Sequence, residues 1–317
     1  MLVSVQVNRI ILEIAAVYYM KLTIFTPTYN RANCLINALD SLLRQTDHSF
    51  VWLIVDDGST DNTKALVDDW ISERIISIEY YYQQNAGKMA AHNWAAQLCK
   101  TELFMCLDSD DQLTDTAVED VISFWEKHRN DRDDLLGIIA PKTIVNKEGS
   151  VVRNPEIPKG IEYTTGRGLY QSGYRGETAM VFRTEILRKY PFPVQDGEKF
   201  ISEISAYDAM DEHYVMLAYN RPLMICEYQE DGYSNNLLKI NVANPKGVVY
   251  VNQQRQKMLH RFSPTLMREY IAYSRIAKYS WKKIVLDSRY PLYCLLMLPW
   301  GFLKMKRLLQ TLKDNEK

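Results

Sequence analysis

An acidic motif follows one apolar stretch of the sequence. Residues 103–107 read Leu-Phe-Met-Cys-Leu, and Asp108, Asp110 and Asp111 follow within four residues. Carboxylates this close repel each other, which raises the pKa of at least one of them unless a cation lies between them. Proteins usually hold Mg²⁺ through one or two carboxylates together with phosphates of the substrate. The motif therefore predicts a metal site for a phosphorylated substrate, and the structural alternative is a solvated turn before the next helix.

Three further polar segments also follow apolar, strand-like stretches. They are Thr26-Pro27-Thr28-Tyr29-Asn30-Arg31, Asp56-Asp57-Gly58-Ser59-Thr60-Asp61 and Asn85-Ala86-Gly87-Lys88. Between the strand-like stretches, apolar residues recur at helical spacing, which predicts strands alternating with helices and hence a largely parallel sheet. Ligands of such sheets bind beyond the carboxyl ends of the strands. We therefore expect the four polar segments to form one site.

The bulk composition excludes several classes of protein. Lys and Arg number 38 against 39 Asp and Glu, giving a net charge of -1, so no basic field indicates nucleic acid. Five scattered cysteines without a CxxC pair favour a reducing compartment over a disulfide framework. The sequence has neither the GxGxxG of dinucleotide-binding folds nor the GxxxxGK[ST] of P-loop enzymes.

The four motifs, in this order, resemble those of glycosyltransferase family 2, which are inverting enzymes that use nucleotide sugars. The resemblance is clear over residues 21–130 and looser beyond them. It implies an α/β fold of the GT-A type: a Rossmann-like, mostly parallel sheet with helices on both faces, here followed by a C-terminal helical extension. It also implies that Mn²⁺ or Mg²⁺ is the cofactor.

The resemblance assigns a role to each motif. The first segment and Arg31 would contact the nucleotide, the paired aspartates after the second strand would bind the base, and Lys88 would lie near base or phosphate. Asp108 would approach the ribose, and Asp110 would ligate the metal on the diphosphate. The implied donor-binding set is Pro27, Thr28, Tyr29, Arg31, Asp56, Asp57, Asn85, Gly87, Lys88, Asp108 and Ser109.

The acceptor hydroxyl must lose a proton as it attacks, so a carboxylate base is expected in the second half of the chain. By resemblance, Glu203 fits this role best at the start of a helix predicted to run to about Tyr219, followed by Glu198 and then Asp196. The structural alternative for Glu203 is an acid stabilised by the helix dipole. Arg175-Gly176-Glu177 and Glu230-Asp231-Gly232 are candidates for the acceptor side, whereas His92 and His213 are expected to be packing or surface residues.

The pattern divides the chain into four segments. Residues 1–19 are expected to be an extension outside the fold, residues 20–130 the nucleotide-sugar-binding half, 131–235 the acceptor-binding half, and 236–317 a helical C-terminal region. The apolar stretch 291–303 is flanked by Lys and Arg and contains Trp300. This makeup fits either an interfacial membrane element within residues 285–310 or a core helix.

The resemblance predicts transfer of a sugar, from a UDP-sugar by preference, to a hydroxyl of a glycan or lipid-linked acceptor in cell-surface polysaccharide or capsule synthesis. The Gln-x-x-Arg-Trp motif of processive synthases does not occur, so we expect an enzyme that adds single sugars. We expect it in the cytoplasm or peripherally on the inner face of the membrane. The alternatives are a non-catalytic nucleotide-sugar-binding module and a sugar nucleotidyltransferase.

Overall fold

The computed structural model describes residues 20–227, 233–259 and 261–315. The predicted extension 1–19 lies outside these ranges, as does the candidate acceptor segment Glu230-Asp231-Gly232. The described residues form two compact units. The first contains residues 20–191 and 208–227, and the second contains residues 192–207 and the helical remainder of the chain.

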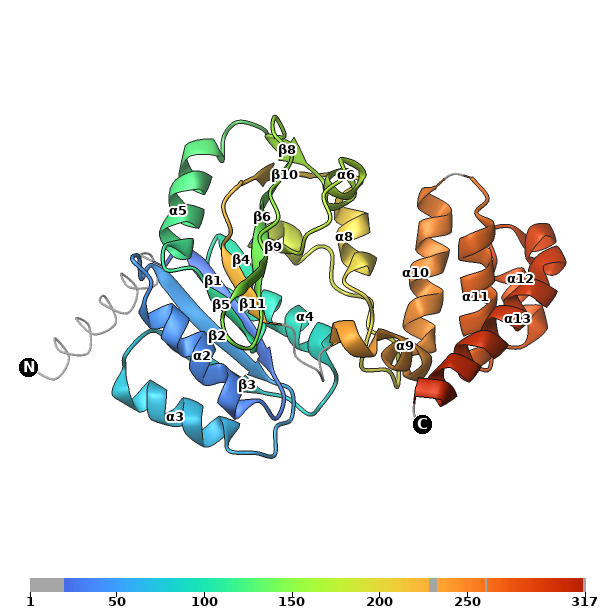
Figure 1. The fold of residues 1–317 in the computed structure, drawn as a ribbon, viewed down its shortest axis with the longest axis horizontal. Helices are drawn as coiled ribbons and strands as arrows, with labels where there is room; N and C mark the ends of the chain where they lie inside the picture. The colour runs from blue at the N-terminus through green and yellow to red at the C-terminus, as the bar shows by residue number, and fades with distance from the viewer. Residues whose placement is uncertain (1–19, 228–232, 260, 316–317) are drawn as a thin grey trace, which may run out of the picture. The chain divides into compact units, whose positions relative to one another are not determined.

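The first unit begins with four strands that alternate with three helices, as the sequence predicts. The strands pair in parallel in the spatial order β3-β2-β1-β4. Thr28 at the end of β1 is paired with Asp56 of β2, which is paired with Tyr82 of β3, so their polar segments leave the sheet at the same edge (Figure 1). The elements are β1 Leu22–Thr28, α2 Ala32–Leu43, β2 Phe50–Asp56, α3 Thr63–Glu73, β3 Ile78–Tyr82, α4 Lys88–Leu98 and β4 Leu103–Cys106.

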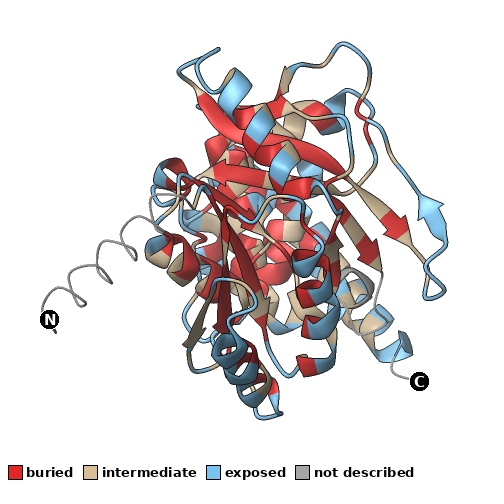
Figure 2. Ribbon diagram, turned by 90° about the vertical axis from the view of Figure 1, so that its left-hand side faces the viewer, coloured by how far each residue is buried: buried red, intermediate tan, exposed pale blue. Residues whose placement is uncertain are grey.

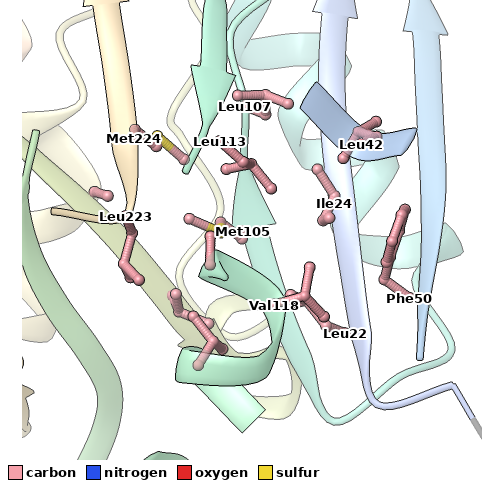
Figure 3. Packing of buried hydrophobic residues seen from close by; sticks show 14 of the residues in the cluster. Leu22, Ile24, Leu42, Phe50, Met105, Leu107, Leu113, Val118, Leu223 and Met224 are labelled. Carbon is pink, nitrogen blue, oxygen red and sulfur yellow. The ribbon is translucent and has the colours of Figure 1, made fainter. Parts of the chain in front are cut away.

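Successive side chains of β1 pack on opposite faces of the sheet. Ile24 belongs to a large apolar cluster that includes Leu42 of α2 (Figure 3). The cluster also includes Trp70 of α3. On the other face, the ring of Phe25 contacts the ring of His92 in α4, with centroids 5.4 Å apart. Helices therefore cover both faces, as predicted, and β1, β2 and β4 are mostly buried (Figure 2).

The position of His92 predicts a pH dependence of stability. Burial, with a contribution from Lys88, lowers the pKa of His92 from 6.5 to about 3. The unfolded chain then binds more protons than the folded chain between these values, so the free energy of unfolding falls as the pH falls through this window. We expect a loss on the order of 2 kcal/mol between about pH 6.5 and about pH 5. Chemical denaturation of His92→Leu should show a shallower pH dependence than wild type, whereas His213→Leu, at an exposed histidine, should match wild type.

The second half of the sheet is mixed in direction. β9, Thr178–Arg183, runs antiparallel to both β4 and β6, Leu135–Val145. At Gly137 of β6, where φ is +150°, a Cβ atom would lie 1.9 Å from the carbonyl oxygen of Val181, so only glycine permits this approach of β6 to β9. The remaining elements are β5 Asp111–Leu113, α5 Ala117–His128, β7 Val151–Arg153, β8 Tyr163–Thr164, α6 Gly166–Gln171, α7 Thr184–Leu187, β10 Val215–Ala218 and β11 Met224–Glu227.

One predicted element was wrong. The helix expected to run to about Tyr219 ends at Met210 as α8, Ile204–Met210, and β10 follows. β10 pairs in parallel with β6 and in antiparallel with β8, and it buries Met216 and Leu217. Pairing with a strand on each side stabilises the extended backbone of β10. The spacing of apolar residues in the sequence does not reveal these partner strands.

The second unit contains five helices among its described residues, which confirms the predicted helical extension. Its core includes Met267, Tyr270, Ile271, Ile284 and Cys294. The helices are α9 Tyr233–Ala243, α10 Pro245–Met258, α11 Pro264–Ile276, α12 Trp281–Leu286 and α13 Pro291–Asn315. Within the described part of the chain, no helix combines the length and the apolar character needed to cross a membrane.

Candidate functional site

Asn30 ties the segment after β1 to the segment after β2. Its φ of +52° is in the left-handed region, which asparagine tolerates better than most residues. The side-chain oxygen of Asn30 accepts hydrogen bonds from the backbone N–H groups of Thr60 at 2.7 Å and Asp61 at 3.3 Å. The N–H of Asn30 donates to Oγ of Ser59 at 2.8 Å. Pro27, Thr28, Tyr29 and Arg31 are therefore held beside the second polar segment.

Asp56 and Asp57 are buried, and their carboxylates accept hydrogen bonds from groups of the protein itself. Asp56 accepts from the N–H of Ser59 and from the hydroxyl of Tyr80, both at 2.7 Å. Asp57 accepts from the side-chain amide of Gln83 at 2.6 Å and from the N–H groups of Ala86 and Gly87 at 2.7 and 2.8 Å. These bonds fix the third polar segment, which contains Asn85. Three of the roughly four acceptor positions of Asp57 are thus filled, so hydrogen bonding to a base stays a prediction.

The acidic motif lies against the basic residues of the other segments. Nζ of Lys88 is 2.8 Å from Oδ1 and 2.9 Å from Oδ2 of Asp108. Nη1 of Arg31 is 2.8 Å from Oδ2 of Asp110, and each of these two side chains is 23% exposed. Ser109, between the two aspartates, is buried. The structure therefore brings together residues that are up to 79 positions apart in the sequence.

A third ion pair was missed by the sequence analysis. Nζ of Lys142, on β6, is 2.6 Å from Oδ2 of Asp111, and both side chains are almost fully buried. Cys226 of β11 is paired with Asp111 of β5, so this ion pair lies where three strands meet. The sequence signal for this ion pair is a lysine within an otherwise apolar, strand-like stretch, because a buried lysine needs a carboxylate partner.

The charges around the acidic motif set different ionisation properties for its members. Burial favours the neutral acid, but Lys88 and Lys142 lower the pKa of Asp108 to about 2. Burial and the neighbouring Asp108 and Asp111 raise the pKa of Asp110, against the opposing effect of Arg31. Although burial favours its neutral amine, Asp111 and Asp108 hold the pKa of Lys142 well above its usual range. Burial and Asp108 also raise the pKa of Asp111, against the opposing effect of Lys142. Asp110 is 23% exposed and Asp111 only 4%, so Asp110 is the carboxylate of raised pKa that an additional cation can reach.

The donor set fits a hard divalent cation bound together with a substrate. Among the described residues, no three His, Cys, Asp or Glu side chains gather to hold a metal by themselves. Mg²⁺ and Mn²⁺ accept one or two carboxylates when phosphate oxygens complete the coordination. The partly exposed carboxylate of Asp110 would be such a ligand, and Arg31 and Lys88 lie beside the acidic motif as cations of the kind that bind phosphates.

The two glutamate candidates for the base have different surroundings. Glu198 is buried, and its carboxylate accepts from the N–H groups of Lys246 at 2.7 Å and Gly247 at 2.8 Å, at the N-terminus of α10. Glu203 is half-buried directly before α8, where its backbone carbonyl accepts from the N–H groups of Ala206 and Tyr207, each at 3.1 Å. Asp196 is exposed, and its carbonyl accepts from Nζ of Lys246 at 2.6 Å.

Other candidates also have defined positions. Nη1 of Arg175 donates to the carbonyls of Tyr170 at 2.6 Å and Tyr174 at 2.8 Å, so this arginine organises its own loop. A carboxylate oxygen of Glu177 lies 3.9 Å from Sγ of Cys226. His92 is buried against aromatic rings and His213 is exposed, which confirms both as packing or surface residues.

Comparison with known proteins gives a consistent result for the first unit. A family model described as glycosyl transferase family 2 matches residues 23–190. The chain is 32% identical over 174 residues to the teichoic acid poly(glycerol phosphate) polymerase of Staphylococcus epidermidis, covering 54% of this chain and 23% of that protein. It is 24% identical over 273 residues to the chondroitin synthase of Escherichia coli, covering 84% of this chain and 37% of that protein. The chain therefore spans well under half the length of these curated relatives.

Solved structures match nearly the whole chain in fold. Residues 1–349 of TarS from S. aureus superpose with a TM-score of 0.57 at 16% identity, covering 93% of this chain and 92% of that one. The same fragment solved with UDP-GlcNAc gives a TM-score of 0.56 at 15% identity, covering 94% and 91% of the two chains. At this identity the likeness concerns the fold, and it agrees with the predicted fold class.

Proposed function

The chain belongs to glycosyl transferase family 2, and from this premise we propose that it transfers a sugar from a nucleotide diphosphate sugar to a hydroxyl group of a glycan or lipid-linked acceptor. The observation that carries the proposal is the pair of ion contacts Arg31–Asp110 and Lys88–Asp108 at the carboxyl edge of the sheet. They place carboxylates for a metal and cations for phosphates at the edge where ligands of such sheets bind.

A uridine donor is the favoured choice. Two of the matching solved structures hold UDP or UDP-GlcNAc, and a mannosyltransferase from Pyrobaculum calidifontis with a TM-score of 0.50 was solved with GDP-Man and Mn²⁺. In the proposed donor site, Pro27, Thr28, Tyr29 and the buried Asp57 surround the nucleotide. Asp108 and Ser109 face the ribose. The Arg31 and Lys88 cations would balance the charge of the diphosphate.

In the proposed reaction, the acceptor hydroxyl displaces the nucleotide diphosphate from the anomeric carbon in one step, so the anomeric configuration inverts. Asp110 would hold Mn²⁺ or Mg²⁺, which when bound supplies Lewis-acid stabilisation of the diphosphate leaving group. Arg31 and Lys88 keep the phosphates oriented. A carboxylate takes the proton of the hydroxyl as it attacks.

We assign the base role to Glu203 in preference to Glu198. The Glu198 carboxylate already accepts two backbone hydrogen bonds at the N-terminus of α10, where the helix dipole also stabilises its charge. Each of its two carboxylate oxygens is therefore already engaged by a backbone N–H group of α10. Glu203 is half-buried directly before α8, which is the position that the resemblance to the family implies for the base.

The relatives suggest a biological setting. The names of the two curated relatives concern teichoic acid and chondroitin, so we propose that this chain acts in the synthesis of a cell-surface polysaccharide such as a capsule. We propose a cytoplasmic reaction, because no disulfide joins any of the five cysteines, all of which lie in described residues.

Donor binding can be tested by thermal denaturation of the full chain. UDP with Mn²⁺ should raise the melting temperature, because a ligand that binds only the folded state stabilises it by about 2.7 kcal/mol at about 100 times its dissociation constant. Omitting Mn²⁺ should weaken the shift, and GDP provides the matched comparison. If neither nucleotide changes the melting temperature at saturating concentration with Mn²⁺, the chain lacks the proposed donor site.

A further inference from the structure

Helix α13 has an exposed apolar side. Leu292, Leu295, Leu296, Trp300 and Leu303 are 78%, 55%, 68%, 55% and 52% exposed. Their spacing of three and four residues places them along one side of the helix. We call these five residues the outer face of α13. An exposed and contiguous set of large apolar side chains of this kind marks an interaction surface.

The opposite side of α13 is fixed against its own unit. Cys294 and Gly301 are buried there, and a Cβ atom at Gly301 would lie 2.4 Å from Cγ2 of Ile271 in α11. The sequence left open whether this segment is a core helix or an interfacial element. In the structure one side of α13 packs on α11, as in a core helix, and the outer face remains exposed.

The outer face lies in a positively charged part of the sequence. Residues 281–315 contain seven Lys or Arg and two Asp, although the whole chain has a net charge of -1. Lys306 and Arg307 lie about one turn beyond Leu303 on the same side of the helix, and both are exposed. Lys304 pairs with Glu269 and Lys283 pairs with Asp287. The positive excess of this segment therefore comes mainly from Lys282, Arg289, Lys306 and Arg307, of which Lys306 and Arg307 continue the outer face along α13.

We propose that the outer face of α13 docks on a membrane surface that contains anionic lipid, with the helix lying in the plane of the interface. Apolar residues with a tryptophan enter the boundary of the acyl chains, and the neighbouring cations contact the headgroups. A second copy of this chain is a poorer occupant, because it would bring the same positive charge to the interface. The docking does not depend on donor chemistry, so it goes beyond the proposed function.

The experiment is flotation of the full chain with vesicles. The chain should bind vesicles of phosphatidylcholine mixed with phosphatidylglycerol, bind phosphatidylcholine alone far less, and dissociate as salt is raised. Leu296→Ser with Leu303→Ser should weaken binding roughly 100-fold, from the apolar surface lost. Lys306→Gln with Arg307→Gln should weaken it roughly 30-fold on anionic vesicles only. Point variants are preferable to a truncation, because removing α13 would expose the core that contains Ile271.

The matched control is Val151→Ser with Val152→Ser, which removes two side chains that are 63% and 66% exposed on β7 of the first unit. This variant should bind vesicles like wild type. All variants should keep the wild-type melting temperature and the response to UDP with Mn²⁺. Failure of the wild-type chain to float with anionic vesicles at low salt would overturn the proposal. So would a dimer in solution that is lost in the leucine variant, since a second copy would then cover the outer face.

Discussion

Replacing Asp110 with asparagine is expected to abolish metal-dependent donor binding and to lower the rate of UDP-sugar hydrolysis or transfer by about 1,000-fold or more, because Lewis-acid stabilisation of a leaving group contributes several kcal/mol. The amide keeps the size of the side chain but removes the charge that a divalent cation requires. The fold should survive, because burial and the neighbouring Asp108 and Asp111 disfavour the charge of Asp110, so the neutral amide relieves repulsion that offsets the lost contact with Arg31.

The matched control for this variant is Asp115→Asn. Asp115 also pairs with an arginine, Arg44, at 3.0 Å, but both side chains are about half exposed and lie outside the four motifs. Titrations of UDP with and without Mn²⁺ should show a metal effect in the control that equals wild type. An Asp110→Asn protein whose UDP affinity still depends on Mn²⁺ would show that the metal ligand is elsewhere.

Replacing Glu203 with glutamine is expected to lower the turnover of a UDP-sugar by about 100-fold to 10,000-fold, the range typical for loss of a general base. Water can serve as the acceptor in this assay, so the natural acceptor need not be known. UDP affinity and the melting temperature should stay at wild-type values, since no donor contact is assigned to Glu203.

Glu198→Gln provides the contrast. An amide oxygen cannot reproduce the two backbone hydrogen bonds and the charge that Glu198 offers at the N-terminus of α10, so this variant should lose about 1–3 kcal/mol of stability. Its turnover at a temperature where it is folded should be near wild type. The opposite pattern, with full turnover in Glu203→Gln and none in a stable Glu198→Gln protein, would exchange the two roles.

Local sequence determined the first half of the molecule. Each apolar stretch between Leu22 and Leu107 has the length of a buried strand and is followed by turn-forming residues, such as Asn30, Gly58 and Gly87. Strands that alternate with helices in this way typically form a parallel sheet covered by the helices. In such a sheet the strand ends meet at one edge, so the proximity of Arg31, Lys88 and the acidic motif could be predicted without coordinates.

Tertiary structure alone decided the second half. Lys142 becomes the partner of Asp111 only because β6, β5 and β11 meet, and Glu198 is bound at α10 by donors that are 48 and 49 positions away. Val215–Ala218 is a strand because it lies between β6 and β8, and α13 is a packed helix with an exposed apolar face because Gly301 admits Ile271. In each case the deciding contact joins residues that are distant in the chain. The local spacing of apolar residues carries no information about the free energy of such a contact.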